Sequence, residues 1–305
     1  MKRKIIKQGL GGYTIYLPKT WVENKGLTEQ KEVEIIESEN DLIIRSPKIT
    51  QKETSIELTE DNIHDINVIL THAYRGGYDK ITLKNVDDKS LSAIKKITNN
   101  LLLGFEITSQ TEGTCVLENV SEPSEEKFET LLRRIFLIIK ETQSLISKDF
   151  EKSKYENYEK AVEYKEQLDK FVLFCRRITA KEKNTKDPII TWELLTFLTH
   201  IQHAQIYMYE YASTNKIHSD KTMINLIREL REYFDIYYDS YFKKDIKGVH
   251  KINKLRSNLH FGQCIELLEK SRGKNTVIYS YMREIFRLIQ IGTSPILSGI
   301  IEEKL

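Results

Sequence analysis

The sequence predicts an α+β protein with more than one domain. Three observations lead to this fold class. Short β-rich runs broken by glycine and proline fill residues 1–46. Strand and helix patterns alternate over residues 54–120. Apolar residues keep helical spacing through residues 124–305. With 305 residues, of which 40% are hydrophobic and 30% charged, the chain can bury a core and is not expected to be disordered.

The first segment predicts four short strands and one short helix. The strands are expected at 4–7, 13–17, 31–36 and 41–45, and the helix at 18–25. Gly11 and Gly12 separate the first two strands, Pro18 suits the first turn of the helix, and Gly26 ends it. Residues 38–41 predict the turn of a second hairpin. A unit this small cannot close a core alone, so we expect it to need a partner subunit.

The middle segment predicts a small α/β layer. Strands are expected at 55–58, 78–83, 105–109 and 114–118, and helices at 60–74 and 87–103. Thr59 is the expected N-cap of the first helix, Gly76-Gly77 its end, and Asp87 begins the second. None of these strands is followed by a glycine-rich loop of the kind that binds phosphate groups.

The third segment predicts six helices joined by short loops, which favours antiparallel bundles. The first begins near 124 and keeps helical spacing through Ile146, and the others are expected near 155–182, 188–214, 220–244, 246–271 and 276–304. Pro123 with the acids beside it marks the first helix start, and Pro188 another. The pattern groups as three helices plus three, which predicts two three-helix bundles.

The net charge of +2 excludes a protein that coats nucleic acid, but it hides a segregation of charge. Residues 1–25 contain six basic residues and one acid, a net charge of +5. Residues 26–46 contain two basic residues and six acids, a net charge of −4. In a dimer the basic ends would supply about ten positive charges, enough for sequence-tolerant binding to duplex phosphates. The alternative is a solvated basic terminus.

The order of motifs in residues 1–46 resembles the AbrB/SpoVT-type swapped-hairpin DNA-binding domain. The matching features are RKIIK, GGYTIYLPK, Trp21, KGL at 25–27, and the final hairpin. This resemblance implies an interleaved homodimer that binds double-stranded DNA. By position it implies DNA contacts at Lys2, Arg3, Lys4, Lys7, Tyr13, Thr14 and Lys19. Many bacterial members have an arginine in the loop where this chain has Gly12-Tyr13-Thr14, which favours phosphate positioning over base readout.

The rest of the chain resembles archaeal PhoU-like phosphate-uptake regulators. The features are AYRGGYDKI at 73–81, LGFEI at 103–107, LLRRI at 131–135 and the two groups of three helices. The resemblance implies a homodimeric regulator of phosphate uptake that acts on transcription. The basic start of the chain is not followed by the apolar core of a signal peptide, so we expect the protein to be cytoplasmic. The alternative is an interaction protein that docks on a phosphate transporter or sensor kinase without binding DNA.

The acidic metal motif of that family is altered here. PhoU domains bind metal clusters through carboxylates four residues apart on a helix, but Lys165 stands four residues before Asp169. The remaining candidates are Asp169, His200 and His203, of which the two histidines could ligate a transition metal. We expect instead that they pack or pair locally, and that no metal or other cofactor is bound. A metal-storage protein is the weaker alternative.

Other chemistry-bearing residues favour structural roles. Tyrosine and phenylalanine recur at helical spacing over 207–211 and 233–242, which suits a ligand pocket less well than bundle packing or a dimer seam. Cys115, Cys175 and Cys264 form no metal or disulfide motif and are expected to be buried free thiols. No nucleophile motif is present, so we do not expect an enzyme. No apolar run approaches the roughly 20 residues of a membrane span, so we expect no membrane insertion.

Overall fold

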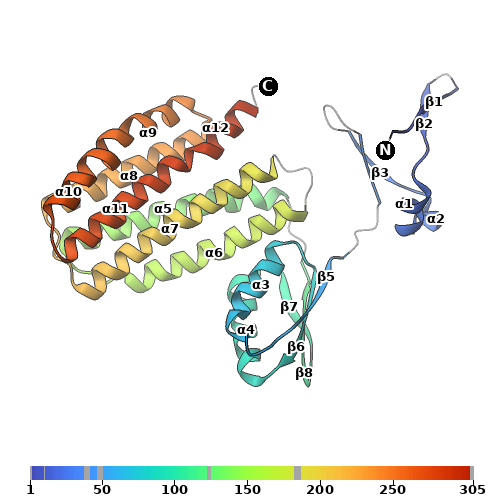
Figure 1. Ribbon diagram of the computed structural model, residues 1–305, viewed down its shortest axis with the longest axis horizontal. Coiled ribbons are helices and arrows are strands. Elements are labelled where there is room, and N and C mark those ends of the chain that lie inside the picture. The colour runs from blue at the N-terminus through green and yellow to red at the C-terminus, as the bar shows by residue number, and fades with distance from the viewer. Residues whose placement is uncertain are drawn as a thin grey trace. The chain divides into compact units, whose positions relative to one another are not determined.

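The computed structural model describes residues 2–9, 11–37, 42–46, 51–121, 125–181 and 187–302. They belong to two compact units, Met1–Gln51 and Lys52–Leu305, which are described separately (Figure 1). The predicted turn at 38–41 and the predicted helix start near Pro123 lie outside the described residues. The α+β fold class is confirmed.

The first unit contains the two predicted hairpins and the predicted helix. Its elements are β1 (Ile5–Gln8), β2 (Gly12–Ile15), α1 (Lys19–Asn24), α2 (Leu27–Gln30), β3 (Glu34–Glu37) and β4 (Leu42–Arg45). β1 pairs with β2 and β3 with β4, both antiparallel, as two separate two-stranded sheets. The single turn of α2 was not predicted. Gly26, in the left-handed region at φ 64°, turns the chain from α1 into it.

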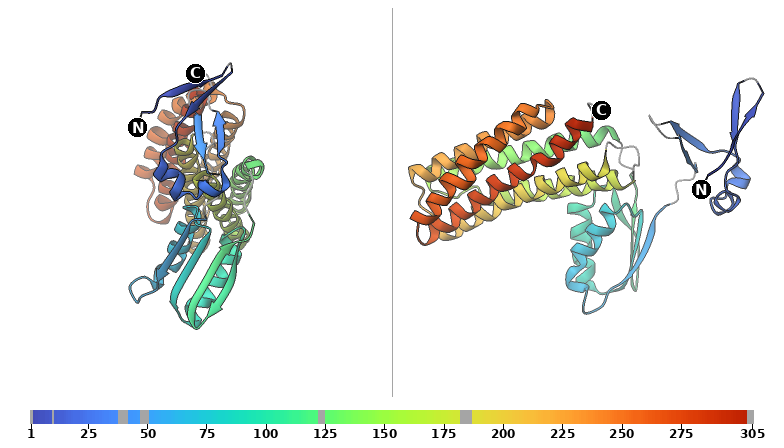
Figure 2. Two further views of the ribbon diagram at one scale, coloured as in Figure 1. Left: turned by 90° about the vertical axis from the view of Figure 1, so that its right-hand side faces the viewer. Right: turned by 45° about the horizontal axis from the view of Figure 1, so that its top comes forward.

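The second unit begins with a four-stranded sheet covered on one side by two helices (Figure 2). Its elements are β5 (Glu53–Glu57), α3 (Ile66–Arg75), β6 (Lys80–Val86), α4 (Asp88–Leu101), β7 (Phe105–Thr111) and β8 (Gly113–Asn119). The strand order is β5-β6-β8-β7, with β5 and β6 parallel and the other pairs antiparallel. Burial alternates along β6, so one face of the sheet packs against the helices.

The start of α3 differs from the prediction. The helix begins at Ile66, after a 3-10 turn η1 (Ile63–Asp65), and Thr59 does not cap it. The side chain of Asn62 accepts a hydrogen bond from the Thr59 backbone N–H at 2.8 Å and donates to the Glu57 carbonyl at 3.0 Å. This local turn holds the chain out of the helix for six residues. By contrast, Asp87 caps α4 as predicted, through reciprocal hydrogen bonds with Ser90.

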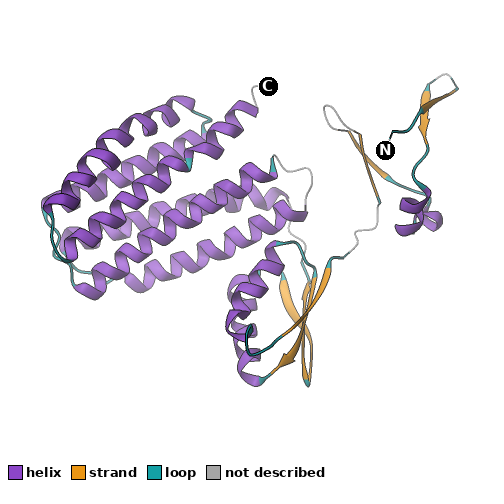
Figure 3. Ribbon diagram, viewed as in Figure 1, coloured by secondary structure: helices purple, strands orange, loops and turns teal. Residues whose placement is uncertain are grey.

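The described strands all precede residue 120, and the chain from α5 onward is helical (Figure 3). The helices are α5 (Glu125–Lys152), α6 (Tyr158–Lys181), α7 (Pro188–Asn215), α8 (Lys221–Phe242), α9 (Ile246–Asn258), α10 (Cys264–Lys270), α11 (Lys274–Ile291) and α12 (Thr293–Glu302). The first four match the predicted helices closely.

The fifth and sixth predicted helices are each divided, which corrects the prediction of six continuous helices. A π-helical turn, η2 (Leu259–Gln263), separates α9 from α10. Gly292 separates α11 from α12. The buried hydroxyl of Tyr237 donates a hydrogen bond to the Gly292 carbonyl at 3.1 Å. This carbonyl, at the end of α11, is thus satisfied by a side chain.

The helices pack as two groups that share one hydrophobic core. Helices α5, α6 and α7 contact one another, as do α8, α9 and α11. The groups meet where α5 contacts α8 and where α7 contacts α11. Tyr209, Tyr233, Phe234 and Tyr237 are buried in the shared core, which confirms the predicted packing role for these four residues. Tyr207, which the same prediction included, is 47% exposed and does not pack in this core.

The contact of α9 with α8 depends on Gly248. A Cβ atom at this position would lie 2.2 Å from Ser240 Oγ, and Ser240 is buried with its hydroxyl donating to the Ile236 carbonyl. We expect Gly248→Ala to lower the free energy of unfolding by about 1–3 kcal/mol, measured by urea denaturation. Ser240→Ala in the same chain removes the clashing oxygen and should restore part of the loss. A double variant as unstable as Gly248→Ala would contradict this explanation.

Helix α6 joins two parts of the second unit: the sheet with α3 and α4, here called the α/β module, and the helices from α5 onward, here called the bundle. Leu173, Phe174 and Ile178 of α6 belong to the core that α3, α4 and the sheet form. Beside them the guanidinium of Arg177 is fully buried and contacts the loop after α3.

At this junction Arg177 contacts both a carboxylate and backbone carbonyl groups. It donates to Asp79 Oδ1 at 2.6 Å, to the Tyr78 carbonyl at 2.5 Å and to the Tyr74 carbonyl at 3.2 Å. Its guanidinium also lies over the Phe105 ring, at 4.9 Å from the centroid. The junction is therefore held by a buried ion pair as well as by apolar contact.

Asp79 is enclosed by hydrogen-bond donors. Lys181 Nζ lies 2.6 Å from Oδ1, and the backbone N–H of Lys52 donates to Oδ2 at 3.1 Å. Burial alone would raise the pKa of Asp79, but these hydrogen bonds and the two cations outweigh it and hold the pKa below its usual range. Asp79 is thus charged at neutral pH.

The three cysteines are buried and unpaired, as predicted. Burial raises the pKa of the Cys175 and Cys264 thiols to about 12, which makes both poor nucleophiles. Among the described residues, no helix has both the length and the apolar character that crossing a bilayer requires.

Candidate nucleic-acid interface

The β1–β2 hairpin divides its side chains between two faces. Lys7 pairs directly with Tyr13, and Ile5 with Ile15. Because side chains alternate along a strand, these four residues share one face. Thr14, opposite Ile6, lies on the other face.

The predicted DNA-contacting residues are therefore only partly brought together. Lys7 and Tyr13 are exposed neighbours on one face of the hairpin, whereas Thr14 lies on the opposite face and is half-buried. Lys2, Arg3 and Lys4 are exposed and precede β1. Lys19 lies on α1, exposed, with its Nζ 3.6 Å from Glu23 Oε1.

The basic side chains at the start of the chain form no ion pair within the part of the first unit that the structure describes. None of Lys2, Arg3, Lys4 and Lys7 has an acidic partner among the residues that the structure describes. The acidic side chains instead lie on the second half of the unit, where Glu32, Glu34 and Glu37 are exposed. The basic residues named here lie before and within β1, and the acidic ones lie just before and within β3.

The first unit also leaves apolar side chains uncovered. Ile5 is 68% exposed, Ile35 57% and Leu42 59%. Among the hydrophobic residues of this unit whose burial is described, Leu27 alone is buried, at 4% exposed. These exposed apolar side chains are therefore available to pack against another surface.

One contact in the hairpin was not anticipated from the sequence. The Thr14 hydroxyl donates to Gln8 Oε1 at 2.6 Å, across the strands on the face opposite Lys7. The alternation of side chains along β1 could have predicted this contact. Gln8 lies two residues after Ile6, the partner of Thr14, and is therefore diagonally across from Thr14 on the same face. This bond occupies the Thr14 proton and reduces its availability to a phosphate oxygen.

The three metal-ligand candidates of the helical region do not form a metal site. His203 Nε2 lies 2.7 Å from Asp169 Oδ1, and Lys165 Nζ lies 2.7 Å from Asp169 Oδ2. Burial would raise the pKa of Asp169, but the hydrogen bond and charge of His203, together with Lys165, hold it below its usual range. Burial lowers the pKa of His200, with His203 and a nearby arginine adding to the effect. Within the described part of the chain, no three His, Cys, Asp or Glu residues are grouped so that they could hold a metal.

Comparison with known proteins gives no assignment: no protein family matches the chain, and no curated protein does either. The two resemblances described above therefore depend on the quoted motifs alone.

Proposed function

We propose that this protein is a homodimeric, DNA-binding transcriptional regulator. In this proposal two N-terminal units complete each other's core, and their basic strands together contact the phosphates of a DNA duplex. The observation that carries it is the coincidence, in one small unit, of unpaired cations with uncovered isoleucine and leucine side chains.

The charge distribution supports phosphate contact more than base readout. Lys7 and Tyr13 lie side by side as exposed donors, and the unpaired cations before β1 extend the basic surface. Lysine ammonium groups bind phosphate oxygens without reading sequence. The acidic hairpin would be repelled by DNA, which leaves the β1–β2 side of the unit as the binding surface.

The helical region is the proposed sensing or docking part. Because this region resembles PhoU-like proteins, we propose that the protein acts in the cytoplasm and regulates phosphate uptake. In the alternative, it binds a phosphate transporter or sensor protein in place of DNA. Buried thiols of high pKa are compatible with a reducing compartment.

Binding stoichiometry tests this proposal. The full-length protein is titrated onto a fluorescein-labelled duplex of arbitrary sequence at low salt, and the mass of the complex is measured by sedimentation velocity. We expect binding of two chains per duplex, and a dimer in the absence of DNA. A monomer that leaves the anisotropy of the duplex unchanged at micromolar concentrations would contradict the proposal and favour the interaction protein.

A further inference from the structure

Helix α9 is strongly basic and contains no acidic residue. Its 13 residues include Lys247, Lys251, Lys254 and Arg256, and none of them is aspartate or glutamate. Together with the residues just before it, the stretch 243–258 contains six basic residues and one acid, a net charge of +5. The overall charge of +2 therefore hides a second basic segment, equal in net charge to residues 1–25.

Three lysines of α9 form a row on its exposed side, here called the lysine row. Lys247, Lys251 and Lys254 are four and three residues apart, a spacing that places side chains on one face of a helix. All three are exposed, whereas Val249 and Ile252 are buried in the bundle core. Helix α9 lies along an outer edge of the bundle, and the lysine row faces solvent (Figure 1).

The lysine row has no counter-charge of its own. On the neighbouring helix α10, Lys270 pairs with Glu266 one turn earlier, at 3.2 Å. Within the part of the chain that the structure describes, Lys247, Lys251 and Lys254 form neither an ion pair nor a hydrogen bond. Because like charges at this spacing destabilise a helix, the lysine row does not serve the stability of α9.

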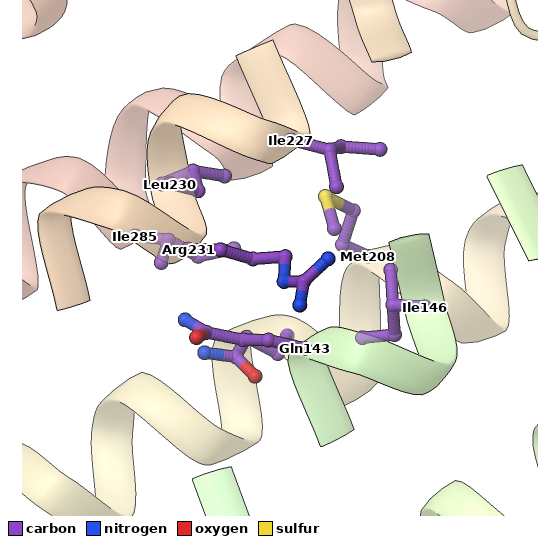
Figure 4. Close-up of a pocket in the computed structure, with 8 residues that line it drawn as sticks. Gln143, Ile146, Met208, Ile227, Leu230, Arg231 and Ile285 are labelled. Atoms are coloured by element: carbon purple, nitrogen blue, oxygen red, sulfur yellow. The ribbon is translucent and has the colours of Figure 1, made fainter. Parts of the chain in front are cut away.

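The arginines of α8 show how basic side chains are used elsewhere in the bundle. Arg228 pairs with Glu151 of α5 at 3.0 Å. The guanidinium of Arg231 points into the space between Met208 and Gln143, at the seam between the two groups of helices (Figure 4). Both arginines thus contact other helices of the same chain, which the lysine row does not.

The π-helical turn that follows α9 exposes an aromatic ring. Phe261 is 55% exposed, while the adjacent His260 is 4% exposed. A π-turn closes over five residues, so residues i and i+5 lie close together. The guanidinium of Arg256 accordingly lies over the Phe261 ring, 5.4 Å from its centroid. The cations of α9 and this apolar ring follow one another within about 20 Å along the chain.

We propose that α9 and its π-turn attach this protein to the surface of an anionic lipid membrane. Lysine and arginine side chains close to such a surface are attracted by its negative potential, and the attractions of neighbouring residues add. The ring of Phe261 enters the boundary between the headgroups and the acyl chains, as aromatic side chains of surface-bound helices do. The attachment is peripheral, and no helix crosses the bilayer.

The exposed ring favours lipid over nucleic acid as the partner of this surface. The phosphates of a duplex would match the lysine row equally well, but a duplex backbone offers Phe261 no apolar layer. An anionic membrane supplies both, because its charged headgroups cover hydrocarbon. The inference concerns the second unit alone and does not depend on DNA binding.

Cosedimentation with vesicles tests the proposal, using the full-length protein at about 0.1 M salt. The vesicles are phosphatidylcholine alone or phosphatidylcholine with about 30% phosphatidylglycerol, which supplies the negative charge. We expect the wild type to bind the anionic vesicles at least about tenfold more strongly than the neutral ones. Replacing the lysine row by Lys247→Gln, Lys251→Gln and Lys254→Gln should weaken binding to the anionic vesicles at least about thirtyfold.

The matched control removes the same charge from another helix. Lys127, Lys148 and Lys152 are exposed on α5, and their replacement by glutamine should leave vesicle binding within about threefold of the wild type. Equal losses in the two triple variants, or no loss in either, would overturn the proposal.

Two further measurements separate lipid from nucleic acid. Phe261→Ala, at an exposed position, should weaken binding to the anionic vesicles about threefold or more, since the apolar contact is lost. The variant without the lysine row should bind duplex DNA within about threefold of the wild type. A loss of duplex affinity in that variant with unchanged vesicle binding would overturn the proposal, because α9 would then be a nucleic-acid surface.

Discussion

Replacing Arg177 with methionine should lower the free energy of unfolding by about 3–5 kcal/mol, the usual cost of removing one partner from a buried ion pair. Arg177 is fully buried and donates to Asp79 and to the backbone carbonyls of Tyr74 and Tyr78. Methionine fills similar space but leaves both carbonyls without this donor. Among the described residues, Asp79 would then keep Lys181 as its one ion-pair partner.

Urea denaturation followed by helical circular dichroism measures this loss. Arg228→Met is the matched control, because the ion pair of Arg228 with Glu151 is exposed and should contribute less than about 1 kcal/mol. If Arg177→Met costs no more than the control, the junction between the module and α6 is held by apolar contact alone.

Reversing three charges in the first unit should reduce affinity for duplex DNA at least about 100-fold near 0.1 M salt. The change is Lys4→Glu, Lys7→Glu and Lys19→Glu in one chain, which alters six charges in the proposed dimer. All three side chains are exposed, so the fold of the unit should tolerate the substitutions. Fluorescence anisotropy with the full-length protein measures the affinity.

The matched control places the same charge change elsewhere. Lys247, Lys251 and Lys254 are exposed on α9, and replacing them with glutamate gives the same net charge. This control should bind DNA within about threefold of the wild type, since its charges lie outside the proposed interface. Similar losses in both triple variants would show that net charge, and not the N-terminal surface, governs binding.

Much of the secondary structure could be predicted because local signals mark it. Pro188 begins α7 where the sequence indicates, and Asp87 with Ser90 caps α4. The start of α3 could not be predicted because the Asn62 turn competes with the helix through side-chain hydrogen bonds. The π-turn η2 lies within a continuous helical pattern that does not distinguish it.

The tertiary contacts were less accessible from the sequence. Arg177 follows Arg176 directly, and two adjacent arginines usually indicate a solvent-exposed helix face. The burial of Arg177 depends on Asp79, which lies ninety-eight positions earlier in the sequence. In the first unit, by contrast, the segregation of charge and the need for a partner subunit were both inferred from the sequence. Ile5 and Leu42 are exposed, and the need for a partner subunit stays a prediction.

The dependence of DNA affinity on salt tests the central proposal most directly. The measurement is the slope of log K against log salt concentration for the full-length wild type on an arbitrary duplex. If about half of the ten positive charges in a dimer contact phosphates, the slope should be about −4 to −5. A slope near zero, or one that the Lys4, Lys7 and Lys19 reversals leave unchanged, would contradict phosphate binding by the N-terminal unit.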